Sequence, residues 1–308
     1  MTGVPLRRVL GASVRGPIHR RDGLPNQDAM GWWGPDQRGS VVVAVADGHG
    51  NHKSFRSQLG AQLAVAVGVS VGRTWAADDA EHRSPADPDV AAVAAQIVGR
   101  WAAAVQAHID KVPLREEELA VVEAEDGWPA RQAVEAEPVL AYGATLLLTI
   151  VQESSAIFLQ VGDGDILVVA PSGRTSRPMP EDSRLMGNET TSLCMRAAER
   201  QFRCRTWSLV DEETAVLILA TDGLGNAYPD EAALGEVGAD LLQRLGKEGP
   251  DTVSDQLEPY LLEAAEHSGD DTTLVVVWLG ADDHAGRAGP FPHRLLWGEP
   301  VTWPPANP

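Results

Sequence analysis

The residues best suited to chemistry in this sequence are aspartates placed beside short apolar runs. Asp47, Asp163 and Asp222 each follow a run rich in Val, Ile and Leu, and Asp270 precedes another. Asp28 lies in a Pro-Asn-Gln-Asp turn before the first strong run. Because short β-branched apolar runs are typical of buried strands, we expect these carboxylates at strand ends along one rim of a sheet.

Such an oxygen-rich rim suits hard divalent cations. Mg²⁺ and Mn²⁺ prefer oxygen ligands, and two such ions that share a carboxylate can direct a hydroxide in line at phosphorus. A glycine follows both Asp47 and Asp222, and a glycine lets the backbone approach an ion closely. A single Asp-Gly pair is more often a simple turn. The complete set, each beside an apolar run, predicts a binuclear metal site.

The elements that must position these aspartates can be predicted from the apolar pattern. Buried strands are predicted at Val41–Ala46, Thr145–Val151, Ala156–Val161, Ile166–Val169, Ala215–Ala220 and Thr273–Leu279. Helices are predicted at Ser54–Val71, Val90–Ile109, Asp230–Leu245 and Val253–His267. Strands, an inserted helical pair and returning strands indicate an α+β fold with a sheet core flanked by helices.

Three stretches are predicted to lack regular structure. Residues 78–89 and 113–138 are rich in acidic residues and proline, which is typical of solvated loops. Residues 281–308 form a tail rich in Pro and Gly, with two tryptophans, which we expect to be irregular. No repeat or boundary interrupts the rest, so residues 1–280 are predicted to form one domain.

Six short motifs occur in order along the chain: Asn26-Gln27-Asp28-Ala29, Val45-Ala46-Asp47-Gly48-His49-Gly50, Gly143-Ala144-Thr145, Val161-Gly162-Asp163-Gly164, Ala220-Thr221-Asp222-Gly223-Leu224 and Gly269-Asp270-Asp271-Thr272-Thr273. Together they resemble the type 2C (PPM) metal-dependent serine/threonine protein phosphatases, in a bacterial-type version, over roughly residues 8 to 279. The resemblance implies a four-layer αββα sandwich with two mainly antiparallel sheets. It also implies hydrolysis of phosphoserine and phosphothreonine in proteins by a metal-bridging hydroxide.

The resemblance further implies roles for single residues. Asp47 would bridge two Mn²⁺ or Mg²⁺ ions, the Gly48 carbonyl would bind one of them, and Asp222 and Asp270 would complete the other. Asp163 would help Asp222 to hold a third, weaker ion.

Two more residues of these motifs are candidate catalytic groups. Asp28 would lie near the metal-bound waters. His49 matches the family's proposed general acid, and a histidine suits this task because its pKa lies near neutrality. The alternative for His49 is a hydrogen bond to a nearby carboxylate.

Three positions depart from the family pattern. Gln27 replaces the usual acid before Asp28, Gly23 stands near the place of the phosphate-binding arginine, and Asn226 stands where many relatives carry an aspartate. These departures leave open a catalytically weak regulatory module that binds a phosphoprotein or kinase. Another class of binuclear phosphohydrolase is disfavoured because such sites usually enlist several histidines.

Two arginines lie close in sequence to Gly23, where the family's phosphate-binding arginine is missing. We expect Arg20 and Arg21 to be close enough to bind the substrate phosphate if the loop is rearranged, and a solvated basic pair is the equal alternative.

Composition limits the partners. The 308 residues include 44% apolar residues and carry a formal charge of −19, which suits a globular domain and disfavours nucleic acid and anionic lipid. Two cysteines cannot make a disulfide framework, and no apolar segment resembles a signal peptide or a membrane span. We therefore expect a cytoplasmic protein. By resemblance, its partners would be a phosphorylated protein substrate and a cognate Ser/Thr kinase.

Overall fold

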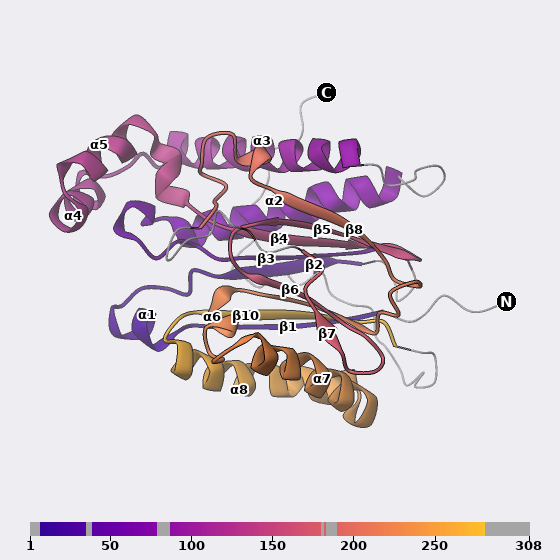
Figure 1. The fold of residues 1–308 in the computed structure, drawn as a ribbon. Coiled ribbons are helices and arrows are strands. Elements are labelled where there is room, and N and C mark those ends of the chain that lie inside the picture. Colours follow the sequence, from indigo (N-terminus) through magenta and orange to yellow (C-terminus); the bar gives the residue numbers. More distant parts are fainter. Residues whose placement is uncertain (1–6, 35–38, 79–86, 180–181, 183–189, 281–308) are drawn as a thin grey trace.

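The computed structural model describes residues 7–34, 39–78, 87–179, 182 and 190–280. These residues form two five-stranded antiparallel sheets, packed face to face between two layers of helices (Figure 1). The predicted αββα sandwich is therefore confirmed. The predicted tail, residues 281–308, lies outside the described residues.

Each sheet combines strands that are distant in sequence. Sheet A has the strand order β1 (Arg8–Val14), β10 (Thr272–Trp278), β9 (Val216–Ala220), β6 (Asp165–Val169) and β7 (Thr175–Ser176). Sheet B has the order β2 (Ala29–Trp33), β3 (Val41–Ala46), β4 (Leu146–Val151), β5 (Ser155–Val161) and β8 (Arg203–Ser208). The pairing of β1 with β10 joins the first and last described strands, with Leu10 opposite Val276.

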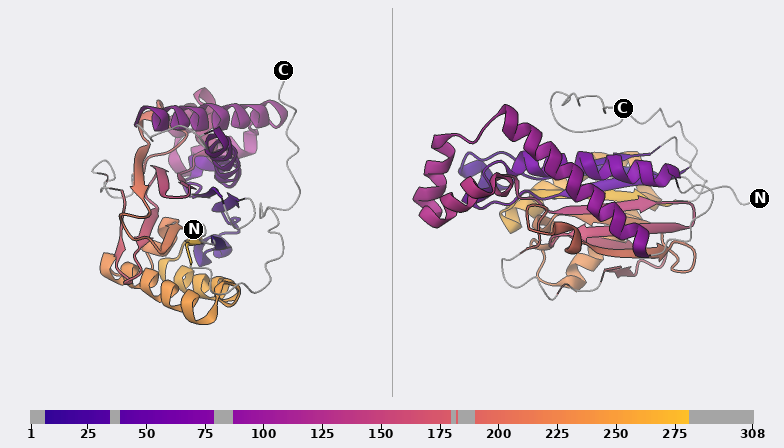
Figure 2. Two further views of the ribbon diagram at one scale, coloured as in Figure 1. Left: turned by 90° about the vertical axis from the view of Figure 1, so that its right-hand side faces the viewer. Right: turned by 90° about the horizontal axis from the view of Figure 1, so that it is seen from above.

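Two helix pairs cover the outer faces of the sheets. The helices α2 (Ser57–Asp78) and α3 (Asp87–Lys111) lie over sheet B, and α7 (Glu231–Glu248) and α8 (Pro250–Ser268) lie over sheet A (Figure 2). Buried apolar side chains fill each of the three interfaces: Trp101 under the first pair, Phe158 between the sheets and Leu261 under the second pair. This layered burial stabilises both sheets and fixes their ends relative to each other.

The predicted loop at residues 113–138 is wrong, because this stretch folds into two helices, α4 (Glu116–Asp126) and α5 (Trp128–Ala136). Three glutamates begin α4, where negative charge stabilises the positive end of a helix. The Glu118 side chain accepts a hydrogen bond from the Arg115 N–H at 2.8 Å. Gly127, with φ of 86°, separates the helices, and Pro129 lies in the first turn of α5. The acidic residues that indicated a loop therefore stabilise the N-terminus of a helix.

Four strands were missing from the prediction: β1, β2, β7 and β8. All four lie at sheet edges. The strands β1 and β8 are partly exposed, and polar residues break their apolar runs, whereas β7 has only two residues and β2 only five, with Gly31 at its centre. Residues 79–86, the middle of the predicted loop at 78–89, lie outside the described residues, and the two ends of this stretch are helical: residue 78 ends α2 and residues 87–89 begin α3. Short helical turns complete the chain: α1 (Pro17–Arg21), η1 (His52–Ser54), η2 (Pro138–Tyr142), η3 (Ala198–Arg200) and α6 (Asp222–Gly225).

None of the helices in the described part of the chain combines the length and the apolar character that a membrane span requires.

Candidate metal centre and active site

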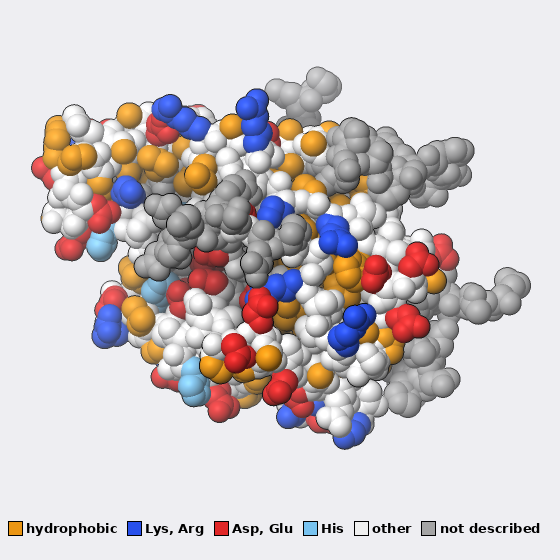
Figure 3. Space-filling view, in the orientation of Figure 1, with side chains coloured by type: hydrophobic (Ala, Val, Ile, Leu, Met, Phe, Trp, Pro, Cys, Tyr) orange, Lys and Arg blue, Asp and Glu red, His pale blue; other side chains and the backbone are white. Residues whose placement is uncertain are grey.

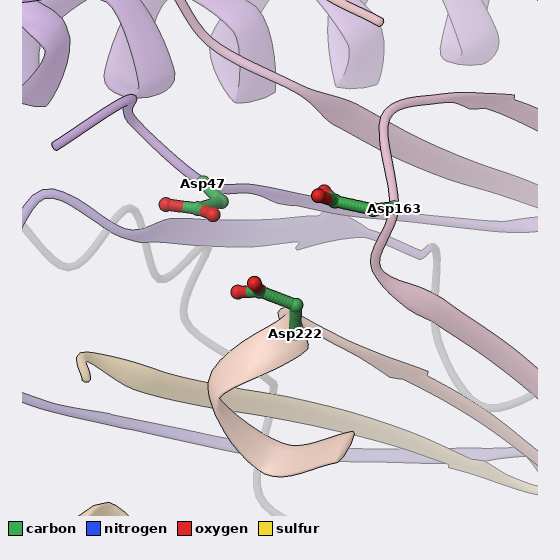
Figure 4. A group of neighbouring side chains, drawn as sticks. All are labelled: Asp47, Asp163 and Asp222. Atoms are coloured by element: carbon green, nitrogen blue, oxygen red, sulfur yellow. The ribbon is translucent and has the colours of Figure 1, made fainter. Parts of the chain in front are cut away.

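Three aspartates from both sheets converge at one end of the sandwich. Asp47 follows β3, Asp163 follows β5 and Asp222 begins α6 directly after β9 (Figure 4). One carboxylate oxygen of each lies within 4.8 Å of those of the other two. On the surface, acidic side chains lie in a hollow between the α4–α5 lobe and the part that carries α1 (Figure 3). The structure thus brings together three of the predicted metal ligands.

The position of Asp47 is fixed by backbone contacts on both sides of its turn. Its N–H donates to Thr145 Oγ1 at 2.9 Å, and the Thr145 N–H donates to the Asp47 carbonyl at 2.8 Å. The Gly48 N–H donates to the Gln27 carbonyl at 3.1 Å. A Cβ at Gly48 would lie 2.8 Å from the carbonyl oxygens of Gln27 and Ser57, so only glycine fits this turn without a shift of the backbone.

Glycines also shape the turns that carry the other two aspartates. Gly162, with φ of 107°, precedes Asp163, and its N–H donates to Thr191 Oγ1 at 2.8 Å. A Cβ at Gly223, the residue after Asp222, would lie 2.0 Å from the Asp271 carbonyl oxygen. These close approaches hold the carboxylates at the sheet rim. The close approach at Gly223 also explains why a glycine follows Asp222.

Asn226 contacts the cluster directly. Its Nδ2 donates to Asp222 Oδ2 at 3.1 Å. Asn226, one of the three departures from the family pattern, therefore orients the candidate metal ligand Asp222.

Asp28 and Asp270 lie beside the three converging aspartates. Asp28 is 7% exposed, and its Oδ2 accepts hydrogen bonds from the hydroxyls of Thr221 at 2.8 Å and Thr273 at 2.7 Å. Asp270 is more open, with 48% of its side chain exposed. Its charge acts on Asp47, whose pKa it helps to raise. Both residues are therefore part of the same electrostatic site.

The clustered carboxylates resist ionisation. Burial, followed by the charges of Asp28, Asp222, Asp270 and Asp163, holds the pKa of Asp47 well above its usual range. Burial is also the first cause that raises the pKa of Asp28 to about 8 and that of Asp222 to about 6. Bound cations remove this cost because they neutralise the carboxylates that otherwise repel one another.

Unpaired oxygens indicate where cations and their waters fit. Asp28 Oδ1, Asp163 Oδ1 and Gln27 Oε1 are buried and have no hydrogen-bond partner among the described residues. Buried oxygens of this kind are normally satisfied by a donor, a water or an ion. The donor set consists of oxygens only, which is the set that Mg²⁺ and Mn²⁺ prefer. The residues present therefore fit hard divalent cations.

His49 lies one residue beyond Gly48, on the same turn. Its N–H donates to the Gly143 carbonyl at 3.1 Å. Burial lowers the pKa of His49, and the charge of Asp163 opposes this shift. An imidazole with a lowered pKa is a stronger acid once it is protonated, although a smaller fraction carries the proton at neutral pH.

Arg20 and Arg21 lie on α1, with their guanidinium groups on carboxylates of the protein surface. Arg20 pairs with Glu266, and Arg21, whose side chain is 71% exposed, pairs with Asp22 at 2.7 Å. A role in phosphate binding would require each guanidinium to leave its carboxylate.

A buried His-Asp pair borders the site and was not predicted. His19 is 8% exposed, and its Nδ1 lies 2.7 Å from Asp271 Oδ2. The hydrogen bond to Asp271 is the first cause that raises the pKa of His19. Asp271 also accepts the N–H groups of Gly16 and Gln27, at 2.7 and 2.6 Å. The pair thus fixes the chain segment that leads to Asp28.

Comparisons with known proteins agree with this geometry. The family model described as protein phosphatase 2C matches residues 15–262. The comparison with curated proteins yields no match. A solved bacterial serine phosphatase has a TM-score of 0.56 at 16% identity, covering 90% of this chain and 99% of that chain. Stp1 from Staphylococcus aureus has a TM-score of 0.56 at 15% identity, with 91% and 98% covered.

A further solved structure is the catalytic domain of the serine threonine protein phosphatase PstP in complex with two manganese ions. It has a TM-score of 0.51 at 18% identity, covering 89% of this chain and 98% of that chain. At these identities the solved structures show a shared fold, whereas the family match spans most of the sequence. On this match, the chain belongs to the protein phosphatase 2C family and is a protein serine/threonine phosphatase.

Proposed function

We propose that the chain hydrolyses phosphoserine and phosphothreonine in proteins with two Mn²⁺ or Mg²⁺ ions at its aspartate cluster. The observation that carries this proposal is the convergence of Asp47, Asp163 and Asp222 within 4.8 Å, from turns of both sheets. The two manganese ions in the PstP catalytic domain, which shares the fold, support the number of ions.

The chain offers a ligand for each role in this proposal. Asp47 would contribute a ligand to both ions, the Gly48 carbonyl would help to hold one, and Asp222 and Asp270 would help to hold the other. Asp163 would take part in a third, weaker site with Asp222. When bound, such cations supply positive charge for the phosphoryl oxygens and an activated water for in-line attack.

The remaining residues would bind, orient and transfer protons. Thr221 and Thr273 donate to one oxygen of Asp28, which leaves Asp28 Oδ1 free to accept a proton from a water. His49 would give a proton to the serine Oγ of the leaving group, since an alkoxide is a poor leaving group. Arg20 and Arg21 would bind the phosphate after leaving Glu266 and Asp22.

The proposal defines the partner by its chemistry. The substrate is a phosphorylated protein, and a Ser/Thr kinase must supply it. The alternative of a catalytically weak regulatory module is not favoured, because the match to a phosphatase family is accompanied by three converging aspartates.

Phosphate release from a phosphoserine peptide tests the proposal. Protein stripped with EDTA should be inactive and should regain activity when Mn²⁺ or Mg²⁺ is added. Asp47→Asn should lower kcat/KM by more than about 100-fold, because a ligand matters at least as much as the groups that orient ligands. Asp251→Asn is the matched control, on an exposed residue at the start of α8. Metal-independent activity, or full activity in Asp47→Asn, would contradict the proposal.

A further inference from the structure

A groove of about 540 Å³ opens beside the proposed metal centre. Two of its lining residues, Gln27 and Gly50, lie next to the site: Gln27 directly precedes Asp28, and Gly50 follows Gly48 by two residues. Its other walls come from the loop after α1, the start of α2, the end of α3 and the exposed side of α4. A molecule bound at the metal ions could therefore extend directly into this groove.

The walls of the groove are apolar although they face solvent. Leu24, Val112 and Val121 line it and are 38%, 45% and 53% exposed. Half-buried Phe55 and Leu59 also line it. Single exposed apolar residues are ordinary, but several around one concavity are typical of a binding surface.

The hydrogen bonds of Arg56 fix the shape of the groove before any molecule binds. Its side chain is only 8% exposed. Its Nη1 donates to the Val112 carbonyl at 2.7 Å and to the Tyr142 hydroxyl at 2.8 Å. Its Nη2 donates to the Pro113 carbonyl at 2.9 Å and to Glu118 at 2.8 Å. These bonds tie the start of α2 to the wall formed by α3 and α4, so that an occupant need not order the wall when it binds.

Of the charged residues that line the groove, two are arginines, Arg56 and Arg115, and one is a glutamate, Glu118. Arg115 lines the groove with a side chain that is 68% exposed and contacts Glu118 at 3.2 Å. The net charge of the whole chain is −19. An exposed guanidinium beside an apolar surface suits a polypeptide that combines apolar and acidic groups, as a phosphorylated segment does.

We propose that this groove binds the polypeptide that flanks the phosphorylated residue, and that it selects substrates with a large apolar side chain in this flank. The inference rests on the proposed phosphatase function and adds a substrate preference to it. A small phosphate ester occupies only the metal centre, so the groove contributes to protein substrates alone.

A leucine scan tests this preference. In a series of Gly/Ser peptides, one leucine is moved along the positions on either side of a phosphoserine, and kcat/KM is measured for each. We expect one placement of leucine to raise kcat/KM by about ten-fold to a hundred-fold, the effect of burying one large aliphatic side chain. Hydrolysis of p-nitrophenyl phosphate serves as the reference reaction for the metal centre.

Two variants assign the preference to the groove. Val121→Glu, and separately Val112→Thr, should remove most of the advantage of the leucine peptide and leave p-nitrophenyl phosphate hydrolysis unchanged. Both positions are exposed, so the fold should tolerate the changes, and an unchanged Tm would confirm this. Val210→Glu is the matched control: Val210 is 68% exposed, lies just after β8 and does not line the groove.

Each remaining outcome overturns the inference. The absence of any leucine preference, or an equal preference in the wild type and in Val121→Glu, would show that the groove does not select the substrate by its flanking side chains. A dimer that forms through this face, seen by sedimentation in the wild type and lost in Val121→Glu, would assign the groove to a second copy of the chain. If the wild type failed to hydrolyse p-nitrophenyl phosphate with Mn²⁺, the proposed function itself would fail, and the groove's role with it.

Discussion

Protein without bound metal should become more stable as the pH falls from 8 to 6. Two buried carboxyls cause this: the pKa of Asp47 is held well above its usual range, and the pKa of Asp28 is raised to about 8 in the folded protein, first by burial and then by the charges of Asp271 and Asp222. In the unfolded chain the pKa of Asp28 returns to its usual value of 3.8. The folded state therefore holds a proton over this pH range that the unfolded state has lost, and folding gains stability as protons become available.

The contribution of Asp28 to the free energy of unfolding follows from its raised pKa. The carboxyl of folded Asp28 is about half protonated at pH 8 and about 99% protonated at pH 6, which corresponds to a gain of about 2 kcal/mol. Asp222, with a pKa of about 6, adds less than about 0.5 kcal/mol over this range. The raised pKa values of Asp47 and His19 act in the same direction. The lowered pKa of His49 opposes it by less than about 1 kcal/mol, because the unfolded histidine takes up a proton first.

Urea unfolding at pH 8 and pH 6, in EDTA, measures this gain. The wild type should gain at least about 2 kcal/mol at pH 6. Asp28→Asn should gain about 2 kcal/mol less than the wild type, and Glu212→Gln, an exposed control, should gain as much as the wild type. Excess Mn²⁺ should reverse the trend, because metal binding releases the protons of its ligands. An unchanged or lower stability of the wild type at pH 6, or the same gain in Asp28→Asn, would refute the reasoning.

Three other substitutions have defined outcomes. Gly48→Ala places a Cβ 2.8 Å from two carbonyl oxygens, so it should destabilise the fold by roughly 1–3 kcal/mol in urea unfolding and weaken Mn²⁺ binding in calorimetry. His49→Asn should slow phosphoserine hydrolysis by about 100-fold and p-nitrophenyl phosphate hydrolysis far less, because that leaving group needs no proton; equal losses would argue against the acid role. Arg20→Ala should raise KM for both substrates by at most about five-fold, whereas Glu266→Gln, which frees Arg20, should lower it; KM values that do not move would exclude Arg20 from phosphate binding.

The strands that carry the aspartates could be predicted because they are buried on both faces. Val41–Ala46 and Val216–Ala220 are fully buried, and a strand between two layers becomes a continuous apolar run that is easy to recognise. Turns that follow such runs then place Asp47 and Asp222 at the rim without further information. The edge strands could not be predicted in this way, since half-exposed segments such as Arg203–Ser208 mix polar and apolar residues.

The parts of the site that sequence could not reveal depend on contacts between distant segments. His19 and Asp271 form a hydrogen bond across 252 positions of the chain, and no local spacing connects them. The groove likewise needs α4, which lies in the stretch 113–138 that was predicted to be a loop because it is rich in acidic residues and proline. Arg20 and Arg21 could be placed near the site from their position on the chain. Their carboxylate partners, such as Glu266, became visible only in the folded structure.

Calorimetric titration of EDTA-treated protein with Mn²⁺ tests the central claim most directly, because it counts ions without reference to any substrate. We expect two ions to bind per wild-type chain, with proton release from the raised-pKa carboxylates, and this binding should be lost in Asp47→Asn while Asp251→Asn retains it. A wild-type chain that binds no Mn²⁺, or an Asp47→Asn variant that binds it as the wild type does, would contradict a metal centre built on the converging aspartates.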